Sequence, residues 1–152
     1  HEAIHVMPTV LENFEFADIV RGSDEDFYNL FKLTDLDRVY QDHVQFYCDN
    51  FLTTRGANGV DLRTSRFTSH IDAQPIQPVS TIGAGDNFNA GIIYGVLKYQ
   101  VRKQDLPTLD KDKWQKIIQC GIDFSAEVCQ SYDNYISSDF ANKYGGAQVK
   151  LK

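Results

Sequence analysis

The sequence has 152 residues, 42% of them hydrophobic and 24% charged, which fits one globular domain and excludes disordered, collagen-like and coiled-coil chains. Its net charge is −6, and Arg102 and Lys103 are the only adjacent basic residues, so we expect no nucleic-acid partner, because phosphate backbones are bound by clustered Lys and Arg. No apolar run has the length of a membrane span, and residues 1–7 lack the basic-then-apolar pattern of a secretion signal, so we expect a cytoplasmic protein with no membrane partner.

The first part of the chain predicts a helix, a short strand and two further helices. Residues 6–14 place apolar side chains on one helical face, and residues 17–20 have the composition of a short strand. Ser23 and Asp26 resemble a capping box with Asp in place of the usual Glu or Gln, which predicts that a helix begins there. A second helix is expected from Thr34 to His43.

The middle of the chain predicts strands joined by a glycine turn. Val44, Phe46 and then residues 51–54 favour extended chain, followed by a turn over residues 56–59, whose residue types tolerate positive φ. Residues 60–65 alternate apolar and polar side chains, as in a strand with one solvated face, and residues 67–73 are a further candidate strand. Prolines at 75 and 78 then indicate a linker, since proline is excluded from central strands. This order of elements predicts a mixed α/β layer structure.

Residues 80–97 carry the most informative pattern, a glycine turn that runs directly into an almost uncharged helix. The apolar positions form a wide face that predicts a buried helix: Phe88, Ile92, Val96, Tyr99, Ile93 and Leu97. Each helical Gly costs about 1 kcal/mol relative to Ala, so Gly91 and Gly95, together with Ala90, predict a neighbour packed close to the backbone. A long helix is expected from Trp114 to about Val128, and the tail from Ser131 has no assigned structure.

The turn formed by Gly83, Ala84 and Gly85 is a candidate anion-binding site. The first N–H groups of a helix lack intrahelical partners, the helix dipole adds about half a positive charge there, and glycine lets a phosphate approach the main chain. The sequence excludes the Walker loop and the dinucleotide-binding loop, because Asp86 follows the glycines where Lys is required and Phe88 replaces a third Gly.

Asp86, at or beside the N-cap of this helix, has two interpretations. A structural Asp there would accept hydrogen bonds from the amides of the next turn, and the motif would then be only a capped, buried helix. In a phosphate site, the carboxylate would instead orient an attacking hydroxyl and take its proton while the amides stabilise the transferring phosphoryl group. The residues alone leave both interpretations open.

The stretch from Ser80 to Gly91, STIGAGDNFNAG, closely resembles the second signature of the ribokinase-like, phosphofructokinase-B-type carbohydrate kinases. Residues 17–26 resemble the family's segment after the substrate half, and residues 53–60 resemble its strand-turn-strand that meets the nucleotide. The resemblance implies a ribokinase-like layered α/β/α fold. Residues 1–152 would be the C-terminal, nucleotide-binding half of a single kinase domain, without the N-terminal half and the lid.

The resemblance also implies roles for individual residues. Asp86 would be the catalytic base, and Gly83, Ala84 and Gly85 would form the anion hole. The nucleotide site would include Thr54, Gly56 and Gly59. Such a kinase phosphorylates a sugar or sugar-like alcohol with ATP and Mg²⁺, and it can form a homodimer through the lid.

Three positions depart from the family pattern. Ser23 and Asp26 stand where members often have Asn and Glu in the segment that organises magnesium, so a metal role for Asp26 is an expectation that Asp24 or Glu25 could share. Ser80 replaces an Asp that helps bind a monovalent cation in many members, which leaves activation by potassium open. These departures favour an alternative function: the chain would be part of a module that binds a nucleotide or sugar phosphate without phosphoryl transfer.

The remaining candidates have structural interpretations beside functional ones. The three cysteines, Cys48, Cys120 and Cys129, are odd in number and widely spaced, which predicts reduced thiols. Trp114, Tyr132 and Tyr135 could stack on adenine, although aromatic residues at helical spacing are more often core. The same choice applies to Arg63 and Arg66, which could reach a phosphate or lie on a solvated strand face.

Overall fold

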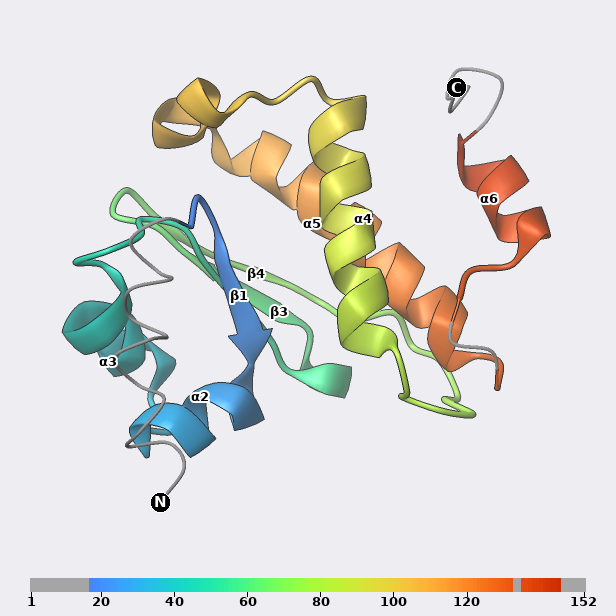
Figure 1. The fold of residues 1–152 in the computed structure, drawn as a ribbon, viewed down its shortest axis with the longest axis horizontal. Helices are drawn as coiled ribbons and strands as arrows, with labels where there is room; N and C mark the ends of the chain where they lie inside the picture. Colours follow the sequence, from blue (N-terminus) through green and yellow to red (C-terminus); the bar gives the residue numbers. More distant parts are fainter. Residues whose placement is uncertain (1–16, 133–134, 146–152) are drawn as a thin grey trace. The chain divides into compact units, whose positions relative to one another are not determined.

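The computed structural model describes residues 17–132 and 135–145, so the helix expected at residues 6–14 lies outside the described residues. The chain divides into two compact units (Figure 1). The first unit runs to Ala73 and includes Lys103–Lys111, and the second comprises Gln74–Arg102 and the chain from Asp112 onward. Helices and strands mix as the sequence predicts, and no helix of the described ranges is both long and apolar enough to cross a bilayer.

The first unit is built on a four-stranded sheet with the strand order β1-β2-β3-β4. Its strands are β1 (Val20–Ser23), β2 (Phe51–Thr54), β3 (Val60–Arg63) and β4 (Thr68–Ile71). β1 pairs with β2 in parallel, and the other two pairings are antiparallel. In this register Leu52 lies opposite Leu62, and both are buried, whereas Asp61 lies opposite Thr53 on one side and His70 on the other. The predicted alternation of residues 60–65 is therefore confirmed.

Helices cover the Phe51 side of this sheet. α2 (Asp24–Phe31) follows β1, and α3 (Leu36–Val39) continues into a π-helical turn, η1 (Tyr40–Val44). The ring centroid of Phe51 lies 4.7 Å from that of Phe27 and 6.0 Å from that of Tyr40. These aromatic contacts, together with buried Val20, Val39 and Val44, form the core of the unit.

Local hydrogen bonds explain where two elements of the first unit differ from expectation. The predicted strand at residues 17–20 begins only at Val20, the residue whose amide reaches the carbonyl of Asn50 at 2.9 Å. The second helix begins after Asp35 rather than at Thr34, because the Asp35 side chain caps it. The prediction of extended chain is confirmed at Phe51–Thr54, which form β2, and is wrong at Val44 and Phe46: Val44 closes the π-helical turn, and Phe46, in the turn beyond it, is 72% exposed.

The second unit is helical, with α4 (Ala84–Lys98), α5 (Lys111–Cys129) and α6 (Ser138–Gly145). A Cβ on Gly91 would collide with the Cys120 carbonyl, and one on Gly95 would lie 3.0 Å from the Cα of Ile117. The predicted close backbone packing is therefore confirmed at both glycines, while Ala90 is exposed. α5 confirms the predicted long helix.

The prediction of a buried α4 is wrong. Ile93 is 62% exposed and Leu97 is 68% exposed, whereas Phe88 and Ile92 are buried. The two glycines determine which side of the helix meets α5, and the helical period then turns Ile93 and Leu97 away from that contact. The apolar width of this helix therefore exceeds the face that α5 covers.

The tail, which has no predicted structure, contains α6. Tyr144 of this helix donates a hydrogen bond to Asp123 Oδ2 at 2.8 Å and packs its ring against those of Tyr94 and Phe124, each with centroids 5.4 Å apart. Tertiary contacts with α4 and α5 therefore hold α6 in place. An isolated helix of this length is marginal in water.

Candidate functional site

The glycine turn before α4 has the geometry of a helix N-terminus built without a side-chain cap. Gly83 is the N-cap, and its φ of 80° is left-handed, a conformation that glycine adopts without steric cost. The Ala84 amide donates to the carbonyl of Thr81 at 3.2 Å, and the Asn87 amide donates to the carbonyl of Gly83 at 3.0 Å. Within residues 17–132 and 135–145, the amides of Gly85 and Asp86 have no acceptor, so these two N–H groups are available to an anion.

Asp86 lies in the first turn of α4 and is exposed. It does not cap the helix, so the capping interpretation is wrong: Gly83 is the cap, and no side chain bonds the first turn's amides. In the part of the chain that the structure describes, the Asp86 carboxylate has no hydrogen-bond or ion-pair partner within its own unit. A free carboxylate beside two free amides can accept a proton while the amides bind negative charge.

The turn from Thr54 to Gly59 belongs to the first unit. Thr54 ends β2, and its Oγ1 accepts a hydrogen bond from Arg21 at 2.8 Å. Gly56 and Gly59 have φ values of 55° and 89°, which confirms the predicted glycine turn. A Cβ on Gly56 would meet open space, whereas one on Gly59 would lie 3.1 Å from the His70 ring and would collide with the Ile71 carbonyl. One end of the turn is therefore open, and the other is packed on β4.

Asp26 is part of the predicted capping box, which the structure confirms. Its amide donates to Ser23 Oγ at 3.0 Å, and its Oδ2 accepts from the Ser23 amide at 2.9 Å. No group of three or more His, Cys, Asp or Glu side chains gathers into a metal site within the described ranges. Carboxylate oxygens suit Mg²⁺, which usually keeps several water ligands, so Asp26 fits such an ion through its second oxygen and water.

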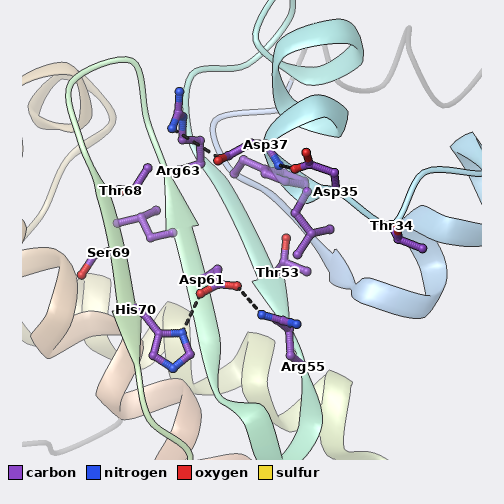
Figure 2. A pocket seen from close by; sticks show the side chains of 13 residues that line it. Thr34, Asp35, Asp37, Thr53, Arg55, Asp61, Arg63, Thr68, Ser69 and His70 are labelled. Carbon is purple, nitrogen blue, oxygen red and sulfur yellow. Dashed lines mark hydrogen bonds and ion pairs between the residues drawn. The ribbon is translucent and has the colours of Figure 1, made fainter.

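A polar hollow of about 440 Å³, which sequence reasoning missed, lies on the sheet of the first unit (Figure 2). Arg55, Asp61 and His70 line it, and they form one hydrogen-bonded chain. Arg63 and Asp37, also in its lining, pair at 3.4 Å. The cross-strand register brings Asp61 and His70 together, and no short sequence motif predicts such a pair.

The other candidates have structural roles. Trp114 is fully buried, as the core interpretation predicts, but Tyr132 and Tyr135 are exposed, so that interpretation is wrong for both tyrosines. Arg66 donates to the carbonyl of Leu109 at 2.7 Å and thereby holds the loop after η3 (Lys103–Thr108).

All three cysteines are free and buried, and burial raises the pKa of each thiol. A raised pKa lowers the thiolate fraction, which makes these thiols poor nucleophiles.

Comparison with known proteins identifies what the chain resembles. A family model described as pfkB family carbohydrate kinase matches residues 2–140. Among solved structures, a Vibrio cholerae fructokinase bound to fructose, ADP and calcium superposes with a TM-score of 0.72 at 20% identity, over 84% of this chain and 39% of the other. A Salmonella enterica aminoimidazole riboside kinase, complexed with aminoimidazole riboside and an ATP analogue, gives 0.75 at 17% identity, over 93% and 47%.

A Thermotoga maritima ribokinase has the same fold, with a TM-score of 0.68 at 15% identity over 88% of this chain and 44% of the ribokinase. The ribokinase-like fold is thus confirmed, and the chain spans less than half the length of each of these three structures. No curated protein sequence matches the chain.

Proposed function

We propose, from the premise that this chain belongs to the pfkB carbohydrate kinase family, that the whole protein transfers a phosphoryl group from ATP to a hydroxyl of a sugar or sugar-like alcohol. The observation that carries this proposal is the start of α4, where the Asp86 carboxylate stands beside the unpaired amides of Gly85 and Asp86. A carboxylate in an anion-binding turn repels its ligand unless it performs a task there. Proton removal from the acceptor is that task.

In this mechanism Asp86 accepts the proton of the attacking hydroxyl as that oxygen forms its bond to the γ-phosphorus. The bond between the γ-phosphorus and the bridging oxygen breaks, and ADP leaves with the electron pair. The turn of Gly83, Ala84 and Gly85 serves as the anion hole: the free N–H groups of Gly85 and Asp86 and the helix dipole stabilise the charge on the transferring group, while the Ala84 amide, bonded to the carbonyl of Thr81, shapes the turn. The fixed main chain of the helix start holds these donors in place before the reaction begins.

The turn at Thr54, Gly56 and Gly59 would hold the nucleotide. The open space at Gly56 supports this role, because main chain without a Cβ lets a ligand approach closely. Two of the similar structures carry ADP or an ATP analogue, which supports ATP as the donor. Asp26 would hold Mg²⁺ through water, and the ion would supply charge neutralisation of the phosphates when bound.

The test is to replace Asp86 by Asn in the whole protein and to measure ATP-dependent phosphorylation across a panel of sugars. We expect the rate to fall about a hundredfold or more, because Asn cannot accept the proton. Asp112→Asn is the matched control, since Asp112 is also an exposed carboxylate in the first turn of a helix. Wild-type rates in Asp86→Asn would remove Asp86 from the role of base.

A binding module without phosphoryl transfer is the second candidate, and the departures at Ser23 and Asp26 favour it. The structure gives Asp26 a capping role, which is sufficient reason for a carboxylate at that position. Calorimetry with ATP, combined with the turnover assay, separates the two functions. Tight ATP binding with no turnover on any sugar would favour the binding module.

A further inference from the structure

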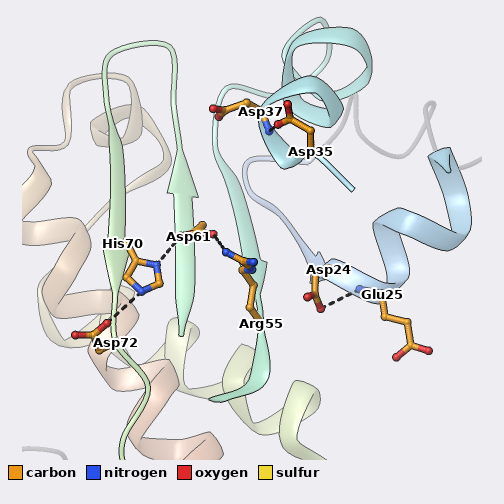
Figure 3. Close-up of polar contacts among 8 residues, drawn as sticks. All are labelled: Asp24, Glu25, Asp35, Asp37, Arg55, Asp61, His70 and Asp72. Carbon is orange, nitrogen blue, oxygen red and sulfur yellow. Dashed lines mark hydrogen bonds and ion pairs between the residues drawn. The ribbon is translucent and has the colours of Figure 1, made fainter. Parts of the chain in front are cut away.

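His70 is held by a carboxylate on each side of its ring (Figure 3). Its Nδ1 lies 2.6 Å from Asp61 Oδ1, and its Nε2 lies 3.2 Å from Asp72 Oδ1. An ionised carboxylate only accepts hydrogen bonds, and a neutral imidazole has only one N–H to donate. Both contacts are therefore hydrogen bonds only when His70 carries two ring protons, so the geometry selects the imidazolium form.

Asp61 connects this imidazolium to the glycine turn. Its second oxygen, Oδ2, lies 3.3 Å from a terminal nitrogen of Arg55, the residue between Thr54 and Gly56. The Arg55 amide donates to the carbonyl of Gly59 at 2.8 Å, and the Gly59 amide donates to the carbonyl of Gly56 at 3.2 Å. The side chain and the main chain of Arg55 thus hold the two ends of the same turn.

The turn also rests directly on the His70 strand. A Cβ on Gly59 would lie 3.1 Å from His70 Cε1 and 3.2 Å from the Ala73 amide, so the Gly59 main chain already contacts the end of β4. If the His70 ring or the residues after it shifted, the main chain of Gly59 would therefore have to move too. Three separate contacts, through Asp61, Arg55 and Gly59, lead from the imidazolium to the turn.

We propose that Asp61 and His70 are positioning residues of the nucleotide site, which hold the turn from Thr54 to Gly59 in its binding geometry while His70 is protonated. Nucleotide affinity then falls as His70 loses its proton. One ring nitrogen then has no hydrogen to donate, and it repels the carboxylate oxygen that faces it. This inference rests on the proposed function, since it takes the turn to be part of the nucleotide site.

The negatively charged groups around His70 favour its protonated form, as this coupling requires. Asp61 faces it from β3 and Asp72 from the chain after β4, and hydrogen bonding to Asp61 is the largest cause of its raised pKa. The positively charged Arg55 contacts Asp61 Oδ2, whereas His70 contacts Asp61 Oδ1. Asp35, Asp37 and Arg63 also line the hollow, and Arg63 pairs with Asp37.

The experiment measures the affinity of the whole protein for a non-hydrolysable ATP analogue by calorimetry between pH 5.5 and 8.5. Because phosphate groups titrate with a pKa of about 6, the readout is the difference between wild type and His70→Gln. We expect wild type to lose about threefold or more in affinity relative to His70→Gln as the pH rises through the raised pKa of His70. Asp72→Asn should move this step to lower pH, a change that a merely structural role would not produce.

Two further measurements keep the result interpretable if a variant is destabilised. Asp42→Asn removes an exposed carboxylate that pairs with Arg38 on the helix of the same unit, and its pH profile should match wild type. Hydrogen exchange at the Gly59 amide should accelerate in wild type above the pKa of His70, beyond the change seen in His70→Gln.

The outcomes separate this inference from the function on which it rests. Binding of the analogue with the same pH profile in wild type and His70→Gln would overturn the positioning role and leave the kinase proposal intact. Failure of the analogue to bind at any pH would overturn both. A pH step that is present in wild type, absent in His70→Gln and displaced in Asp72→Asn would support the inference.

Discussion

The backbone of Gly91 in α4 lies directly against the backbone of Cys120 in α5, with no side chain between them. A Cβ on Gly91 would collide with the Cys120 carbonyl and would lie 2.6 Å from the Cα of Gly121. Gly121 of α5 must likewise lack a side chain, since a Cβ there would lie 2.8 Å from the ring of Phe88 in α4. The helix that carries Asp86 is thus positioned by contacts between main chains.

Gly91→Ala should therefore destabilise the protein. Relief of the collision requires the two helices to separate, and overpacking of this kind costs about 1–3 kcal/mol. The gain in helix propensity, about 1 kcal/mol, offsets part of that cost. Urea unfolding measures the difference. Gly95→Ala is the matched control, because its nearest neighbour lies at 3.0 Å and its net effect should be smaller. Equal effects at both glycines would contradict the packing argument.

Ser23→Ala should lower the unfolding free energy by about 0.5–2 kcal/mol. The substitution removes the Oγ that accepts the Asp26 amide at 3.0 Å and leaves the N-terminus of α2 without its cap. Thermal or urea unfolding would detect the loss. Ser65→Ala serves as the control, since Ser65 is exposed and its hydrogen bond to Asp49 is donated by the main-chain amide, which the substitution keeps. A Ser23→Ala protein as stable as Ser65→Ala would show that the capping box contributes nothing.

Stability should decrease as the pH rises from 6 towards 9, because the pKa of His70 is raised by its hydrogen bond to Asp61. A group with a raised folded-state pKa contributes its full stabilisation below the unfolded value of about 6.5. That contribution is lost as the pH passes through the folded value. The effect should be small, because the His70 side chain is 45% exposed. Urea midpoints of wild type and His70→Gln should converge at high pH, and a constant gap between them would refute the assignment.

Tyr144→Phe should weaken the attachment of α6 by about 1 kcal/mol, the usual net worth of one hydrogen bond. The change removes the hydrogen bond to Asp123 and keeps the ring contacts with Tyr94 and Phe124. Burial raises the pKa of the Tyr144 hydroxyl, which keeps it protonated and able to donate. Urea unfolding gives the value, and Tyr132→Phe, at an 88% exposed position, should have no effect. A loss of similar size at Tyr132 would argue against the hydrogen bond.

Much of the candidate site could be predicted because its signals are local. The capping box of Ser23 and Asp26, the positive φ at Gly59 and the glycine start of α4 each depend on a few consecutive residues. Hydrogen bonding and steric freedom over such short distances are encoded by residue type. The family resemblance rests on the same short stretches, and the match over residues 2–140 confirms it.

The sequence by itself determined where α2 and α4 begin and where the glycine turn at residues 56–59 lies, because those choices depend on neighbours along the chain. Only the tertiary structure decided which face of α4 is covered, that α6 forms against α4 and α5, and that Asp61 joins Arg55 to His70. The physical reason is that each of these features requires contact between residues distant in sequence. Whether such a contact forms depends on strand register and helix packing, which no single segment specifies.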